Sequence, residues 1–167
     1  IKVDGAFSVS CNLEKSSVEL VEWLVKQGHK KIGFIKGPGT IIHSEQRLNG
    51  YYEGLKNNEI PVEESYIVQT NLNKKDNQDA MKALLDLKEP PTAVIAFNDY
   101  VALDAIQYTR SRGLKVNKDI FFASYANLPV TTYLLDRPLI SVEQFPYEQA
   151  EKATELLLQR ITSKIAP

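Results

Sequence analysis

Polar and apolar positions follow two different spacings along the chain. Short unbroken apolar runs, such as residues 93–97, are typical of strands covered on both faces of a parallel sheet. Between these runs, apolar residues recur three and four positions apart, which indicates amphipathic helices. The pattern predicts strands at residues 31–35, 66–69, 93–97, 120–123 and 139–142, with helices between them.

Residues with special backbone preferences mark where these helices begin and end. Gly28 and Gly113 each stand just past an apolar helical face, where a C-terminal capping glycine is expected. Pro90 closes the third helix. Asn12 and Ser44 precede apolar faces and suit N-cap positions.

The alternation of strands and helices predicts an α/β fold, with a mostly parallel sheet and helices on both faces. We also expect a short lead-in strand at residues 6–9 and a final helix at residues 147–163. At 167 residues the chain is long enough to bury a substantial core.

Composition narrows the classes of function. The formal net charge is -1 and no basic stripe is present, so this segment is not expected to contact nucleic acid directly. The single cysteine, Cys11, excludes an internal disulfide and fits a reducing compartment. No apolar run approaches membrane-spanning length. The chain begins with Ile1 rather than Met, so we expect it to be a piece of a longer protein.

Polar and aromatic residues follow several of the predicted strands. Because the carboxyl ends of parallel strands share one edge of a sheet, these residues should lie near one another, at the edge where α/β proteins bind ligands. A guanidinium, amides, a carboxylate and an aromatic ring suit a small polar ligand with hydroxyls, such as a sugar. The predicted ligand-binding residues are Arg47, Asn98, Asp99, Tyr125, Asn127 and Gln144.

Three of these candidates also have an ordinary structural explanation. Asn98 could serve only as a helix N-cap. Asp99 could simply favour the positive end of the helix dipole. Arg47 could be a solvated surface residue. Only the shared position at strand ends favours the joint interpretation as a ligand edge.

Signals for an enzyme are absent from the sequence. Gly37-Pro38-Gly39 lacks the third glycine of a dinucleotide-binding loop, and no phosphate-binding loop is present. No serine or cysteine lies in a nucleophile elbow. His29 and His43 lack metal-ligand spacing. We therefore predict no catalytic residue, no cofactor and no metal site.

An ordered set of motifs runs through nearly the whole chain and resembles a known family. The motifs are residues 28–35 (GHKKIGFI), 47–51 (RLNGY), 91–99 (PTAVIAFND), 113–116 (GLKV) with Asp119-Ile120, and 137–144 (RPLISVEQ). In this order and spacing they resemble the effector-binding domain of lac-repressor-family (LacI/GalR) transcription regulators.

The resemblance implies a periplasmic-binding-protein-like fold of two lobes with a ligand cleft between them. Residues 1–143 would form the C-terminal lobe with its lead-in strand, and residues 144–167 a crossover segment and a helix of the N-terminal lobe. It also implies a cytoplasmic homodimer that binds operator DNA through a helix-turn-helix outside this segment, with no membrane partner. The alternative is an extracytoplasmic sugar-binding protein of a transporter.

Carried over to this sequence, the resemblance gives Arg47 the role of holding the ligand and places Asn98, Asp99, Tyr125 and Gln144 around it. One departure bears on the ligand: where the family usually has an aspartate after the aromatic, this chain has Ala126, followed by Asn127. We also expect the apolar face of the final helix to dock on a neighbouring chain or fold back onto the first lobe.

Overall fold

The structure is a computed structural model that describes residues 7–162, and its contacts divide the chain into two units. The larger unit is Leu13–Glu143. The smaller unit joins the segment before Leu13 to the segment from Gln144 onward. The expected division also fell after residue 143, but it placed the segment before Leu13 with the larger unit. Which lobe of a longer protein each unit represents stays a prediction.

Helices and strands alternate through the larger unit, as the hydrophobic pattern predicts. The elements are α1 (Leu13–Lys26), β1 (Ile32–Lys36), α2 (Ile42–Asn57), η1 (Glu64–Tyr66), β2 (Ile67–Gln69), α3 (Lys74–Leu85), β3 (Ala93–Ala96), α4 (Asp99–Ser111), β4 (Phe121–Tyr125), η2 (Pro129–Tyr133) and β5 (Ile140–Val142). Each of the five strands expected between residues 31 and 142 is present, with its bounds shifted by at most two residues.

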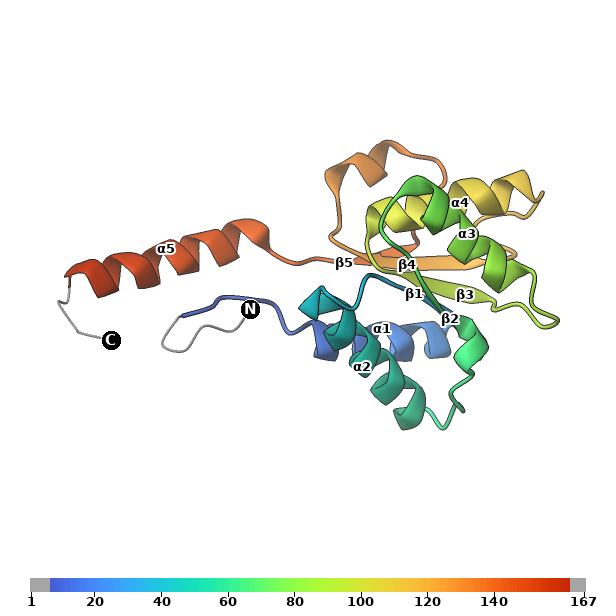
Figure 1. Ribbon diagram of the computed structural model, residues 1–167, viewed down its shortest axis with the longest axis horizontal. Coiled ribbons are helices and arrows are strands. Elements are labelled where there is room, and N and C mark those ends of the chain that lie inside the picture. The colour runs from blue at the N-terminus through green and yellow to red at the C-terminus, as the bar shows by residue number, and fades with distance from the viewer. Residues whose placement is uncertain (1–6, 163–167) are drawn as a thin grey trace. The chain divides into compact units, whose positions relative to one another are not determined.

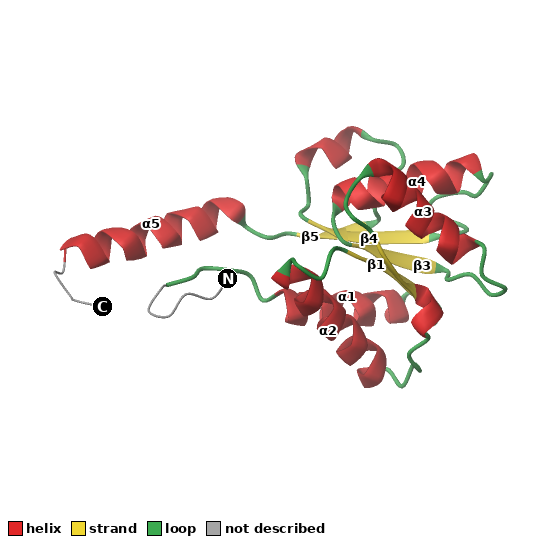
Figure 2. Ribbon diagram, in the orientation of Figure 1, coloured by secondary structure: helices red, strands yellow, loops and turns green. Residues whose placement is uncertain are grey.

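The strands form one parallel sheet in the order β2-β1-β3-β4-β5. Helices α1 and α2 cover one face, and α3 and α4 cover the other (Figure 1, Figure 2). The α/β fold class is therefore confirmed. The central strand, β3, is buried along its whole length, which explains its unbroken apolar sequence.

Helices α1 and α2 approach each other closely because glycines lie between them. A Cβ built on Gly50 would come within 2.1 Å of the Glu14 carbonyl oxygen, and one on Gly54 within 2.7 Å of the Val21 Cβ. Only residues without a side chain fit at this distance. The close packing holds α2, and with it Arg47, against α1.

Two local expectations are wrong. Residues 7–12 form no strand, and Ala6 lies outside the described residues, so the lead-in strand is not found. Ser44 is not an N-cap, because α2 already begins at Ile42. The Ser44 hydroxyl instead donates to the Gly37 carbonyl over 2.7 Å and ties the first turn of α2 to the end of β1.

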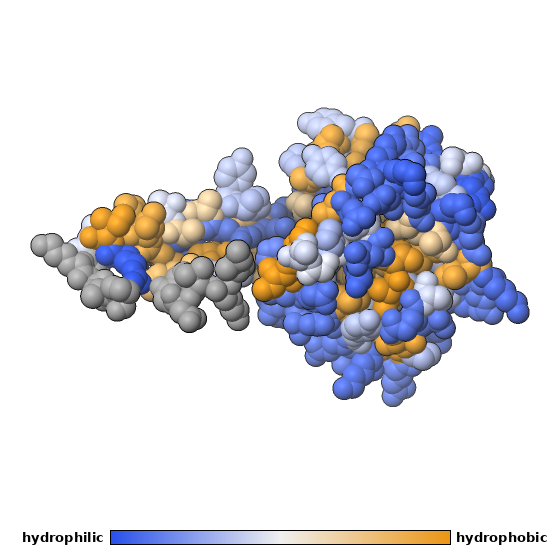
Figure 3. All heavy atoms as spheres, viewed as in Figure 1, coloured by the Kyte–Doolittle hydropathy of each residue, from blue (hydrophilic) through white to orange (hydrophobic). Residues whose placement is uncertain are grey.

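The smaller unit contains α5 (Pro146–Thr162), which confirms the final helix. None of its residues is buried, and Leu157, Leu158 and Ile161 are more than half exposed (Figure 3). Whether this apolar face folds back onto the larger unit or docks on a neighbouring chain stays a prediction. Within residues 7–162, no helix combines the length and hydropathy needed to cross a bilayer.

Candidate functional site

The carboxyl ends of the central strands bring residues from three parts of the sequence together. Strands β1 and β3 pair up to Ile35 and Ala96, and β4 lies on the other side of β3. Phe97 directly follows β3, and Tyr125 is the last residue of β4. Arg47 arrives from the early part of α2. These residues define what we call the arginine edge: Arg47, Phe97 and Tyr125.

The guanidinium of Arg47 lies between two aromatic rings. Its Cζ is 4.3 Å from the centre of the Phe97 ring and 4.6 Å from that of Tyr125. The residue is only 5% exposed, and Nε and Nη1 are buried without a hydrogen-bond partner among residues 7–162. Burial lowers the pKa of Arg47. Two of the three guanidinium nitrogens thus lack both water and a hydrogen-bond partner, which is costly for a charged group.

Arg47 is therefore not the solvated surface arginine of the ordinary interpretation. Cation–π contacts with the two rings offset part of the cost of its burial, by about 1–2 kcal/mol each. They do not satisfy its N–H donors. The arrangement favours a ligand that supplies acceptors at this edge.

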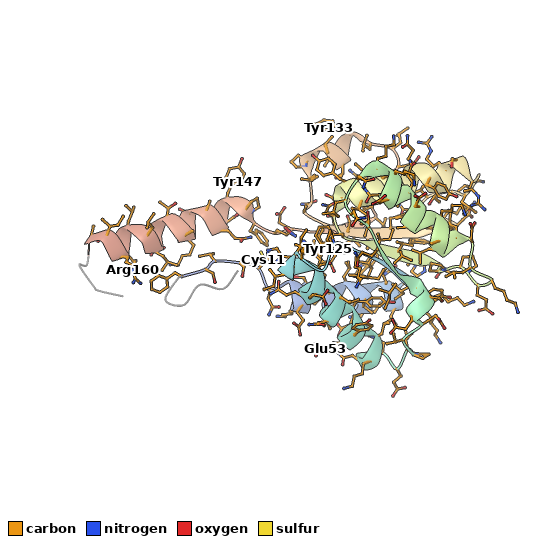
Figure 4. All side chains as sticks on the ribbon, in the orientation of Figure 1. Cys11, Glu53, Tyr125, Tyr133, Tyr147 and Arg160 are labelled. Atoms are coloured by element: carbon orange, nitrogen blue, oxygen red, sulfur yellow. The ribbon has the colours of Figure 1, made fainter. Side chains whose placement is uncertain are left out.

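Tyr125 is fully buried, and its hydroxyl is hydrogen-bonded to α1, one of the two helices on that face of the sheet. Its hydroxyl lies 2.5 Å from Ser17 Oγ on α1. Because Ser17 donates its own proton to the Leu13 carbonyl, the Tyr125 hydroxyl is the donor in this pair. Burial raises the pKa of Tyr125 to about 12, so the hydroxyl stays neutral beside Arg47. Figure 4 shows Tyr125 inside the larger unit, whereas Tyr133 reaches its surface.

Phe97 occupies its position because Gly37 leaves room for it. A Cβ on Gly37 would lie 2.7 Å from the Phe97 ring. Gly37 follows β1 directly and Phe97 follows β3, so the two meet at neighbouring strand ends. Phe97 therefore covers one face of the guanidinium, a role that was not expected from its place at the end of an apolar run.

The side chain of Asp99 makes its hydrogen bonds within the protein, and its role in ligand binding stays a prediction. Its side chain is completely buried, at 0% exposed. The carboxylate accepts hydrogen bonds from Ser124 Oγ, from Ser141 Oγ at 2.7 Å and from the Leu128 N–H at 2.6 Å. These bonds tie the start of α4 to the ends of β4 and β5. Asp99 thus holds the edge together. This structural role differs from the two roles considered from the sequence, ligand binding and interaction with the helix dipole.

The remaining candidates occupy different places. Asn98 is the N-cap of α4, accepting from the Val101 N–H at 3.0 Å, and stays partly exposed beside Phe97. Asn127 is exposed and donates its side-chain amide to Glu143 over 2.9 Å. Gln144 belongs to the smaller unit, where its carbonyl accepts from Cys11 Sγ at 2.8 Å. The structure brings Arg47 and Tyr125 together, with Asn98 directly after Phe97 in the chain, and the place of Gln144 beside them stays a prediction.

The sequence did not indicate the residues that contact the predicted site residues, namely Phe97 beside Arg47 and Ser17 beside Tyr125. Phe97 had a weak signal, since an aromatic ring directly precedes Asn98. Ser17 gave no signal, because it lies 108 residues from Tyr125 in the chain. Among residues 7–162, no group of three His, Cys, Asp or Glu side chains is placed to hold a metal ion.

Comparison with known proteins agrees with this architecture. The model of the periplasmic binding protein-like domain family matches residues 21–167. The repressor CytR of Escherichia coli (strain K12) is 36% identical over 146 residues, which cover 87% of this chain and 42% of the repressor. The probable repressor ExuR of Bacillus subtilis (strain 168) is 31% identical, covering 95% of this chain and 46% of that protein. The chain thus spans less than half the length of these relatives.

Solved structures give the same result. A regulatory protein of the LacI family from Chloroflexus aggregans superposes with a TM-score of 0.90 at 27% identity, over 99% of this chain and 59% of that one. The transcriptional regulator CelR in complex with cellobiose superposes with a TM-score of 0.85 at 25% identity, over 93% of this chain and 47% of that one. The chain belongs to the periplasmic-binding-protein-like domain family, and within it to the effector-binding domains of LacI-family regulators.

Proposed function

We propose that this chain is the effector-sensing part of a cytoplasmic transcription regulator, and that its effector is a small saccharide held at the arginine edge. The observation that carries the proposal is Arg47, a buried guanidinium with unpartnered N–H groups between two aromatic rings. Hydroxyl oxygens of a ligand would accept from the guanidinium, and the partly exposed amide of Asn98 lies next to Phe97 on the same edge. The solved relative CelR binds cellobiose, which supports a saccharide.

Effector binding would control DNA binding by a part of the protein outside this chain. Two sites on one protein are linked by a coupling free energy, typically about 1–3 kcal/mol, and each ligand changes the affinity of the other by the same factor. We infer that the regulator acts as a homodimer whose helix-turn-helix segments contact operator DNA, while this chain contributes the effector site. The alternative of a transporter binding protein is not favoured, because CytR and ExuR are both transcription regulators.

A thermal-shift screen of the full-length protein against mono- and oligosaccharides tests the proposal. A ligand present at about 100 times its dissociation constant stabilises the folded state by about 2.7 kcal/mol. The same compound should change operator affinity in a fluorescence-anisotropy titration. A screen in which no saccharide raises the melting temperature would contradict the proposal.

The role of Arg47 is tested separately by calorimetry. Arg47→Ala in the full-length protein should weaken effector binding by about 1.5–3 kcal/mol, the range for hydrogen bonds to a charged group. Arg110→Ala is the matched control, because Arg110 is exposed on α4 and paired with Asp136 at 3.2 Å. Unchanged affinity in Arg47→Ala would remove Arg47 from the site.

A further inference from the structure

The positive charge of Arg47 has no counter-charge in the larger unit. None of the ion pairs recorded among residues 7–162 includes Arg47. The groups that cover it are the Phe97 ring and the neutral phenol of Tyr125. A desolvated charge without a partner costs several kcal/mol. Such a group persists where another molecule supplies the missing charge.

Two carboxylates at strand ends of the larger unit, Asp99 and Glu143, make hydrogen bonds with groups other than Arg47. Both oxygens of Asp99 accept hydrogen bonds, Oδ1 from two serine hydroxyls and Oδ2 from the Leu128 N–H. Glu143 accepts from the Asn127 amide at 2.9 Å. At the end of β4 the residue after Tyr125 is Ala126, which brings no charge. Neither carboxylate forms an ion pair with Arg47, so the guanidinium has no ion-pair partner within the larger unit.

The guanidinium still has hydrogen-bond donors to offer a ligand, because Nε and Nη1 have no partner among residues 7–162. A neutral hydroxyl would satisfy one donor there but would leave the charge unbalanced. A carboxylate or phosphate oxygen would do both, and such charge-assisted hydrogen bonds are roughly twice as strong as neutral ones.

We propose that the effector held by Arg47 carries a negative charge, as a saccharide with a carboxylate or phosphate group. This inference rests on the proposed function, since it names the chemical class of the ligand for the same site. The proposed function allows any small saccharide, whereas this inference excludes neutral sugars as the preferred effector.

Matched acid and neutral ligands test the inference by calorimetry on the full-length protein. The probes are galacturonate with galactose, glucuronate with glucose, and glucose 6-phosphate with glucose. We expect at least one acidic member to bind about tenfold or more tightly than its neutral parent. If the uronates bind more tightly than their neutral parents and glucose 6-phosphate does not, the charged group of the effector is a carboxylate. If only glucose 6-phosphate binds more tightly than its parent, the charged group is a phosphate.

Two substitutions assign the preference to Arg47. Arg47→Gln should reduce the ratio of acid to neutral affinity to less than about threefold, while Arg47→Lys keeps the charge and should keep a preference at weaker affinity. Arg110→Gln removes an exposed, paired arginine and should leave the ratio unchanged. Should Arg47→Gln fail to fold by circular dichroism, the Arg47→Lys result decides.

Each contrary result has a distinct meaning. A neutral parent that binds as tightly as its acid, and does so through Arg47, overturns the inference and leaves the proposed function standing. A preference for the acid that survives Arg47→Gln also overturns it, because the charge would then act elsewhere. If none of the acids binds, the inference is overturned, and the proposed function falls as well only if the wider saccharide screen shows no stabilisation.

Discussion

The substitution Asp99→Asn distinguishes a carboxylate that holds the edge from one that holds a ligand. Asp99 is completely buried, and its oxygens accept hydrogen bonds from Ser124, Ser141 and Leu128. Asparagine has nearly the same size, so the change removes the charge without opening a cavity. In the variant, the Leu128 N–H donates to the single side-chain oxygen of the asparagine. The NH2 group of the asparagine must then face the hydroxyls of Ser124 and Ser141.

The expected loss follows from the change in each hydrogen bond. Bonds to a charged group contribute about 1.5–3 kcal/mol and neutral bonds about 0.5–1.5 kcal/mol, so each of the three loses about 1 kcal/mol. The free energy of unfolding should therefore fall by about 3 kcal/mol. For a domain of 150–250 residues that unfolds as one unit, this corresponds to a drop in melting temperature of roughly 6–12 °C.

Urea unfolding and thermal unfolding of the full-length protein measure this loss. Asp79→Asn is the matched control, because Asp79 is exposed on α3 and its pair with Lys75 should contribute less than about 0.5 kcal/mol. A loss below about 1 kcal/mol for Asp99→Asn, together with abolished effector binding, would refute the structural role and restore the direct ligand role.

The remaining predictions concern packing and pH. Gly50→Ala should lower the free energy of unfolding by about 1–3 kcal/mol in urea titrations, because its Cβ meets the Glu14 carbonyl; a loss under about 0.5 kcal/mol would show that α1 and α2 can separate freely. Tyr125→Phe should cost about 1 kcal/mol, since Ser17 still donates to a carbonyl; a loss above about 3 kcal/mol in the same assay would contradict this. Burial lowers the pKa of His29 below 6.5, so the unfolded chain binds protons more readily and stability falls as pH drops below that value. His29→Gln should therefore lose less stability than the wild type between about pH 7.5 and pH 5, and equal losses would exclude the histidine as the cause.

Much of the site could be predicted because it depends on strand ends. Arg47, Asn98 and Tyr125 follow apolar runs or open helices, and such positions can be read from a single sequence. The roles of these residues were less predictable. The N-cap bond of Asn98 was expected, whereas the burial of Arg47 between two rings depends on how closely helix and sheet pack.

Asp99 shows where sequence reasoning reached its limit. A carboxylate after a central strand has the same local signature whether it faces a ligand or the protein. Its partners Ser124, Leu128 and Ser141 are 25 to 42 residues away in the chain. Their convergence is a property of the tertiary fold, and no local pattern signals it.

The sequence by itself determined the order of helices and strands, the parallel sheet and which residues follow the strands at the edge where we propose that a ligand binds. It did so because the period of apolar residues and the capping residues act locally, and because parallel strands share one edge. The tertiary structure alone decided which polar groups at that edge remain unsatisfied. Hydrogen bonds between distant residues satisfy the oxygens of Asp99 but leave Arg47 buried without an ion-pair partner, and this difference shapes the ligand we propose.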